Sequence, residues 1–71
     1  MAKKPVHQVK VSRVVASIWE TETENGSRYN VTFQRFYRQG DDWKYSESFG
    51  RDDLLLVAKA ADQAHSWILE Q

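Results

Sequence analysis

The chain has 71 residues and no cysteine, and its ten basic and ten acidic residues give a formal net charge of zero. With 41% hydrophobic, 28% charged and 13% aromatic residues, it has the composition of one small globular domain, which excludes disordered, collagen-like and disulfide-stapled proteins. No apolar run approaches 18 residues and no apolar signal core follows the first residues, so we expect a cytoplasmic protein without a membrane span.

The zero net charge conceals an asymmetry along the chain. Residues 1–38 carry seven basic and three acidic side chains, a balance of +4, whereas residues 39–71 carry three and seven, a balance of −4. Such a chain can present a basic face to a polyanion. Alternatively, the two halves attract each other, either within the fold or between subunits.

The N-terminal half predicts an arm followed by a bent strand. We expect residues 1–8 to form a flexible N-terminal arm and residues 9–71 to form a single domain. The alternation of apolar residues changes phase near Ser12. This change predicts a first strand over about 9–22 with a bulge or bend at that point.

Two turn signals divide the middle of the chain. Asn25-Gly26 lies between β-rich runs, and this dipeptide favours a hairpin because both residues tolerate positive φ. Gly40 marks the next turn. We therefore expect a second strand at about 28–37 and a third at about 43–49, which together with the first form an antiparallel meander.

The C-terminal segment predicts one helix. Asp52 and Asp53 favour a helix start, because carboxylates cap free N–H groups and complement the helix dipole. No Gly or Pro follows Leu54, which predicts a helix of about 18 residues ending near Glu70. The predicted fold class is α+β: an antiparallel meander of three strands, or four if the bend splits the first, with one C-terminal α-helix packed on one sheet face.

Alternation assigns the two faces of the predicted sheet. Phe33 defines the core side of the second strand, and we place Trp43 and Tyr45 of the third strand on that side. The opposite, open face mixes rings that can stack on bases with cations that can follow phosphates. The residues predicted to bind nucleic acid are Arg13, Trp19, Arg28, Asn30, Thr32, Gln34, Arg35, Phe36, Arg38 and Lys44. The alternative is a solvated face whose two large rings, Trp19 and Phe36, form a subunit contact.

The predicted helix is apolar over more than half of its circumference, although burial against one sheet requires a stripe of only about 100°. We expect one arc to pack on the sheet, and it consists of Leu54, Val57, Ala58, Ala61, Ala64, His65 and Ile68. A second stripe is predicted to form a homodimer interface and consists of Leu56, Ala60 and Trp67. The alternative is that the indole of the second stripe folds over the rim of the sheet within one chain.

Side chains that carry chemistry are sparse. His7 and His65 cannot build a local metal site, the paired aspartates suit turns and a helix start, and the serines lack a nucleophile-elbow context. We therefore predict no catalytic residues, no enzymatic activity, no cofactor, no metal and no small-molecule substrate.

The order of three strands, an open sheet and a helix resembles two small families of single-stranded-DNA-binding proteins, the transcriptional coactivators of the positive-cofactor-four type and the Whirly proteins. The segment from Trp43 to Phe49, which runs into Arg51-Asp52-Asp53-Leu54-Leu55, is similar to their last strand entering their helix. This chain has no Lys/Gly-rich segment before that strand. The resemblance covers about half the chain and implies DNA binding and oligomerisation through the helix.

Together these observations predict a homodimer that binds single-stranded nucleic acid, with DNA favoured over RNA, on an open sheet face. The alternative is a protein-interaction or assembly module without nucleic-acid binding. The whole chain is also similar to small bacterial proteins, which implies no function.

Overall fold

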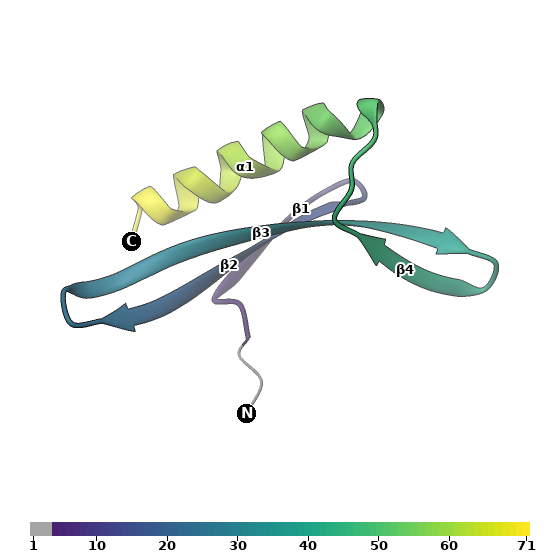
Figure 1. The fold of residues 1–71 in the computed structure, drawn as a ribbon. Coiled ribbons are helices and arrows are strands. Elements are labelled where there is room, and N and C mark those ends of the chain that lie inside the picture. Colours follow the sequence, from purple (N-terminus) through teal and green to yellow (C-terminus); the bar gives the residue numbers. More distant parts are fainter. Residues whose placement is uncertain (1–3) are drawn as a thin grey trace.

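The computed structural model of the protein describes residues 4–71. A four-stranded antiparallel sheet in the order β1-β2-β3-β4 is followed by one helix (Figure 1). The elements are β1 (His7–Val11), β2 (Val14–Thr23), β3 (Gly26–Gln39), β4 (Asp42–Ser46), a short 3₁₀ turn (Arg51–Asp53) and α1 (Leu54–Leu69). The α+β class, the meander and the C-terminal helix are confirmed.

The predicted bend is a two-residue hairpin turn that divides the expected first strand into β1 and β2. Val11 pairs with Val14 across this turn, and Ser12 has a φ of 53°, as tight hairpin turns of the primed types require. Because paired residues share a face, the apolar residues of β1 and β2 meet on one side despite their change of phase. The sheet therefore has four strands.

β1 begins at His7, so part of the predicted flexible arm belongs to the sheet. The backbone N–H of Val6 also donates to the carbonyl of Ile18 at 2.8 Å. Residues 1–3 of the predicted arm lie outside the described residues. Among residues 4–71, no helix is both long and apolar enough to cross a membrane.

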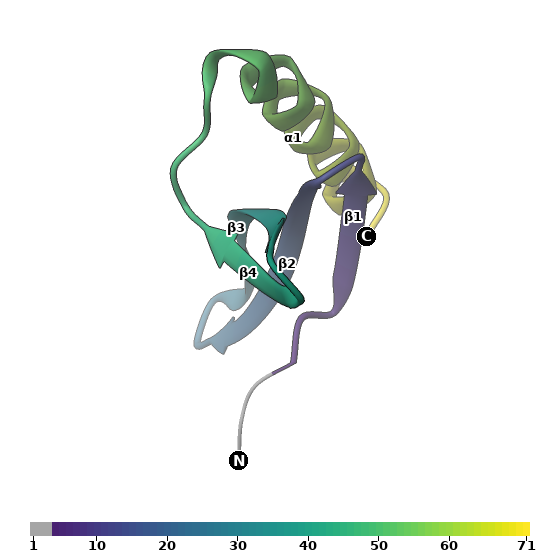
Figure 2. The ribbon, with the colours of Figure 1, turned by 90° about the vertical axis from the view of Figure 1, so that its right-hand side faces the viewer.

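The core lies between α1 and the central part of the sheet. Val14, Ala16 and Ile18 of β2 are fully buried, and α1 presents the buried side chains of Ala60 and Ala64 to them. These small side chains allow the helix backbone to approach the strands closely. Figure 2 shows that α1 covers one face of the sheet and leaves the other uncovered.

The helix packs through parts of both predicted stripes, because Val57, Ala64 and Ile68 of the expected core arc contact the core together with residues of the second stripe. Trp67 stacks on His7 at 4.8 Å and meets Tyr29 edge-on at 6.1 Å, and Leu56 and Ala60 also pack on the core. The rotation of α1 thus places the indole of Trp67 against the sheet beside the fully buried Ala60 and Ala64. The predicted homodimer stripe is therefore engaged within the chain. The prediction of the core arc is wrong for Leu54, Ala58 and His65, which are exposed.

The β3–β4 hairpin projects from the body of the molecule (Figure 1). Gln39 pairs with Asp42 across a two-residue loop that begins at Gly40. Gly40 has a φ of 63°, a conformation that glycine supplies readily at the first position of a type II′ turn. This loop length sets the register and places Trp43 and Tyr45 on the face away from α1. Their predicted place on the core side is wrong, because one residue of register reverses every side chain of a strand.

Candidate nucleic-acid interface

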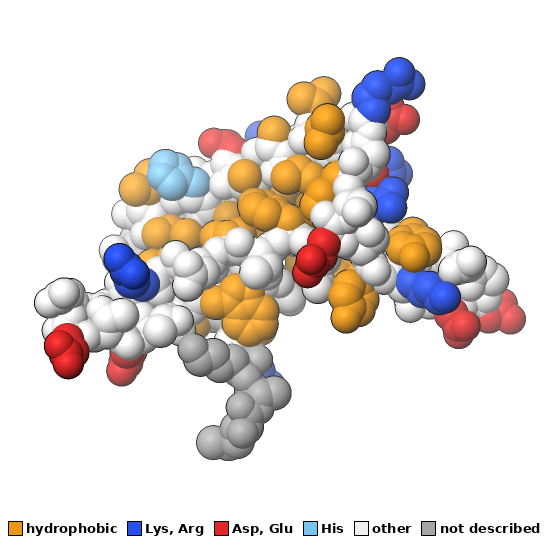
Figure 3. Space-filling view, viewed as in Figure 1, with side chains coloured by type: hydrophobic (Ala, Val, Ile, Leu, Met, Phe, Trp, Pro, Cys, Tyr) orange, Lys and Arg blue, Asp and Glu red, His pale blue; other side chains and the backbone are white. Residues whose placement is uncertain are grey.

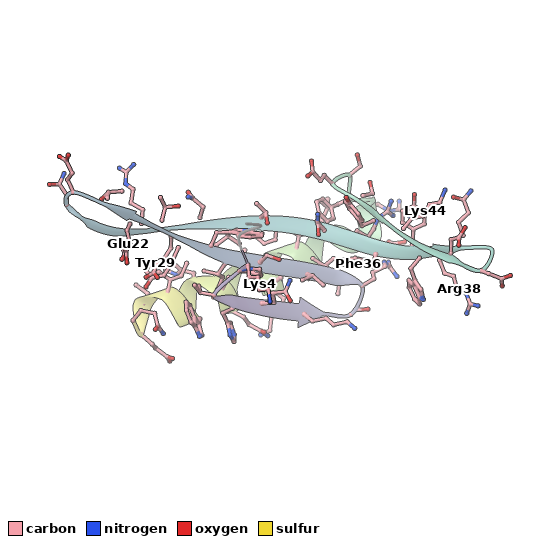
Figure 4. The ribbon with its side chains drawn as sticks, turned by 90° about the horizontal axis from the view of Figure 1, so that it is seen from below. Lys4, Glu22, Tyr29, Phe36, Arg38 and Lys44 are labelled. Carbon is pink, nitrogen blue, oxygen red and sulfur yellow. The ribbon has the colours of Figure 1, made fainter. Side chains whose placement is uncertain are left out.

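The sheet face opposite α1, called the open face here, takes alternate residues from every strand (Figure 4). Seven of the ten residues predicted to bind nucleic acid share this face, whereas Arg13, Arg35 and Lys44 do not belong to it. The strand register assigns to the open face Gln8, Lys10, Val15, Ser17, Trp19, Thr21, Arg28, Asn30, Thr32, Gln34, Phe36, Arg38, Trp43 and Tyr45.

One end of the open face gathers three aromatic rings from β3 and β4. Phe36 lies opposite Tyr45, with ring centroids 6.1 Å apart and planes tilted by 53°. Trp43 is 70% exposed and Tyr45 62% exposed. Sequence reasoning missed these two rings as site residues. The two-residue loop at Gly40 was the signal that could have found them, since it determines which residues of β4 face the same way as Phe36.

A hollow of about 380 Å³ lies beside these rings and is called the β4 hollow here. Its lining residues are Lys10, Ser12, Arg13, Phe36 and Trp43. They come from β1, from the β1–β2 turn, from β3 and from β4, so only the folded sheet brings them together. Two of the five are cations, two are aromatic and none is acidic.

Trp19 occupies a separate part of the open face. It pairs with Asn30, and its Nε1–H donates to Oγ1 of Thr32 at 2.9 Å. Asn30 and Phe36 are six residues apart on β3, which separates the two rings by about 20 Å at ~3.3 Å per residue. This separation is several times the ~3.4 Å spacing of nucleotides in a duplex strand. Trp19 and Phe36 would therefore contact different parts of a bound strand.

Arg35 lies on the helix side and ties the sheet to the start of α1. Its Nη1 donates to Oδ2 of Asp53 at 3.2 Å, while the Nε of Arg13 donates to Oδ1. The backbone N–H of Gly50 also donates to this carboxylate, at 3.2 Å. The hydrogen bond from Arg13 is the largest cause that lowers the pKa of Asp53, because it favours the ionised form. Arg35 therefore serves the fold rather than the open face.

Arg13 differs from Arg35 in its exposure. Its side chain is 48% exposed, whereas that of Arg35 is 30% exposed, and it lines the β4 hollow. Two guanidinium groups on one carboxylate leave one net positive charge. A guanidinium has five N–H donors, so Arg13 can hold Asp53 and still present N–H groups to an anion.

The remaining predicted cations divide between the two faces. Lys44 pairs with Tyr37 on the helix side of the sheet, so its prediction as an open-face residue is wrong. Arg38 lies on the open face, where its Nε donates to the carbonyl of Gly40 at 3.1 Å and its Nη2 is 3.8 Å from the exposed carboxylate of Asp41. Such exposed pairs are weak, so phosphate can compete for Arg38. Lys4 adds a cation on the open side, where the N-terminal arm leaves the sheet (Figures 1 and 4).

Within residues 4–71, no group of three or more His, Asp or Glu side chains is arranged to hold a metal ion. No family model, curated protein or solved structure matches this chain. The functional proposal therefore depends on the geometry and chemistry of the open face.

Proposed function

We propose that the protein binds single-stranded nucleic acid on the open face. The observation that carries this proposal is the concentration of exposed aromatic rings and cations on one face of a chain whose net charge is zero. The preference for DNA over RNA rests on the resemblance of the chain to single-stranded-DNA-binding families.

A single strand suits this surface better than a duplex does. Each base of a single strand can offer its flat face to Trp43, Tyr45 or Trp19, and stacking of this kind contributes about 1–3 kcal/mol per base. In a duplex, the faces of the bases are covered by their neighbours. Between the aromatic ends of the open face, the hydroxyl of Thr32 and the amide of Gln34 can donate hydrogen bonds to a strand.

The test is a fluorescence-anisotropy titration of labelled single-stranded DNA, single-stranded RNA and duplex DNA. Removing two stacking rings with Trp43→Ala and Tyr45→Ala should weaken single-strand binding by about 30-fold or more, at ~1 kcal/mol or more per ring. Both side chains are largely exposed, so the variant should keep its fold, as circular dichroism will show. The matched control is Tyr37→Ala, which removes an exposed ring from the opposite face of the same hairpin. A folded aromatic variant with wild-type affinity would reject the open face.

We also propose that the protein is a homodimer, joined through the outward side of α1 rather than through the buried stripe. Leu54, Leu55 and Leu69 are 56%, 82% and 69% exposed. Figure 3 shows hydrophobic side chains continuing from the junction of helix and sheet onto the helix. The chain exposes 5721 Å², compared with about 4,600 Å² expected for a monomer of its mass. The surplus of roughly 1,100 Å² is enough for the ~800 Å² that each partner buries in a standard interface.

Sedimentation equilibrium tests the dimer. The wild type should sediment as a dimer, and Leu55→Glu with Leu69→Glu should sediment as a folded monomer, because two carboxylates would be desolvated in the interface. A monomeric wild type would disprove this assembly. If single-strand binding is absent but the dimer forms, the exposed rings of Trp43 and Tyr45 favour the second candidate function, a protein-interaction module.

A further inference from the structure

We propose that the β4 hollow is a pocket for one nucleotide, in which the base stacks on Trp43 and Phe36 and the phosphate meets Lys10 and Arg13. This inference rests on the proposed function and deepens it, because it identifies the part of the open face that holds a nucleotide most tightly. It also predicts that an isolated mononucleotide binds there.

The size and lining of the hollow suit such a ligand. Its volume of about 380 Å³ is at the small end of the ~300–1,000 Å³ typical of ligand pockets. Phe36 is partly buried in the lining of the hollow, whereas Trp43 is 70% exposed and leaves its ring open to contact. A base that enters between them would cover apolar surface that the fold leaves open.

The charge of the hollow favours an anion. Lys10 contributes one positive charge, and the pair of arginines on Asp53 contributes a second after the carboxylate is neutralised. The side chain of Arg13 is partly exposed at the rim, and Arg35 forms a second ion pair with Asp53. A phosphate can therefore approach two cations without breaking the contact that anchors α1.

A second hollow on the molecule lacks this combination. It measures about 470 Å³ and is lined by Thr23, Asn25, Ser27 and Arg28 at the β2–β3 turn. It offers one cation and no aromatic ring, so it can meet a phosphate but cannot stack a base. The β4 hollow is the better nucleotide pocket despite its smaller volume.

The test is a titration of the full chain at low salt with thymidine 5′-monophosphate, thymidine or inorganic phosphate, followed by the indole N–H signals in ¹H–¹⁵N NMR spectra. The monophosphate should shift the signal of Trp43. It should leave unchanged the signal of Trp67, whose ring packs between α1 and the sheet. Lys10→Ala should weaken the monophosphate about tenfold, the effect of losing one charged hydrogen bond, and should not change the affinity for thymidine. Lys44→Ala is the matched control, because it removes a lysine from the opposite face.

The outcomes separate this inference from the proposed function. Monophosphate binding that shifts Trp43 and weakens in Lys10→Ala supports the pocket, even if oligonucleotides fail to bind. If oligonucleotides bind but the monophosphate leaves the Trp43 signal unmoved, the pocket is wrong and the open-face proposal stands. Equal weakening by Lys10→Ala and Lys44→Ala would likewise reject the pocket, since it would reflect total charge alone.

Discussion

The dependence of binding on salt follows from how the fold distributes its cations. Lys4, Lys10, Arg13, Arg28 and Arg38 lie on the open side or at its rim, whereas Lys44 lies on the other face. Each phosphate neutralised on a single strand contributes about 0.7 to the slope of log affinity against log salt. Five contacts therefore give a slope of about −3.5. Raising the salt from about 50 to 200 mM should lower the affinity roughly 100-fold.

Anisotropy titrations of single-stranded DNA at four or five salt concentrations measure this slope. Lys10→Ala should reduce its magnitude by about 0.7, the share of one phosphate contact. Lys44→Ala changes the net charge by the same amount and should leave the slope unchanged. The assignment of faces would be refuted by a slope that decreases equally in both variants, and a slope near zero would show that phosphates are not contacted.

Two further predictions concern the scaffold. Ile18→Ala removes a fully buried side chain from the centre of the sheet and should cost about 2–5 kcal/mol in urea unfolding, whereas Val15→Ala, on the half-buried open face, should cost less. A similar loss at both positions would contradict the location of the core. The pKa of Asp53 is lowered on folding, so its ion pairs stabilise the protein fully above the ordinary aspartate value of 3.8 and lose this contribution as the pH falls through the folded pKa. Asp53→Asn should therefore be less stable than the wild type at neutral pH, and the difference should shrink in acid. A difference independent of pH would show that charge at this position is unimportant.

The strands and the helix were predictable because their signals are local. Asn25-Gly26 and Gly40 each mark a hairpin turn that the structure contains, and the change of phase at Ser12, predicted as a bulge or bend, is a third hairpin turn. The segment after Asp53 contains no helix breaker and is helical to Leu69. Turn chemistry and helix propensity act over a few residues, so they can be recognised in a single sequence.

Errors arose where the direction of a side chain depends on a partner. Alternation within β4 is the same whichever face its odd residues take, and only pairing with β3 places Tyr45 beside Phe36. The rotation of α1 was similarly ambiguous, because its apolar residues cover more than one stripe. In the structure, residues of both stripes contribute to the core, and only the packing of α1 on the sheet shows which of them are buried.

The sequence by itself determined the fold class, the hairpin turns at Gly26 and Gly40, the helical segment after Asp53 and the supply of rings and cations, since each depends on composition or on local conformational preference. The tertiary structure decided which of these groups can act together. Register placed Trp43 on the open face and Lys44 on the other, because paired residues in a sheet share a face. Arg35 and Arg13 both pair with Asp53, which is distant in the sequence. Arg35 lies on the helix side of the sheet, whereas Arg13 lies at the rim of the β4 hollow. These contacts join residues up to 40 positions apart, and no local pattern specifies them.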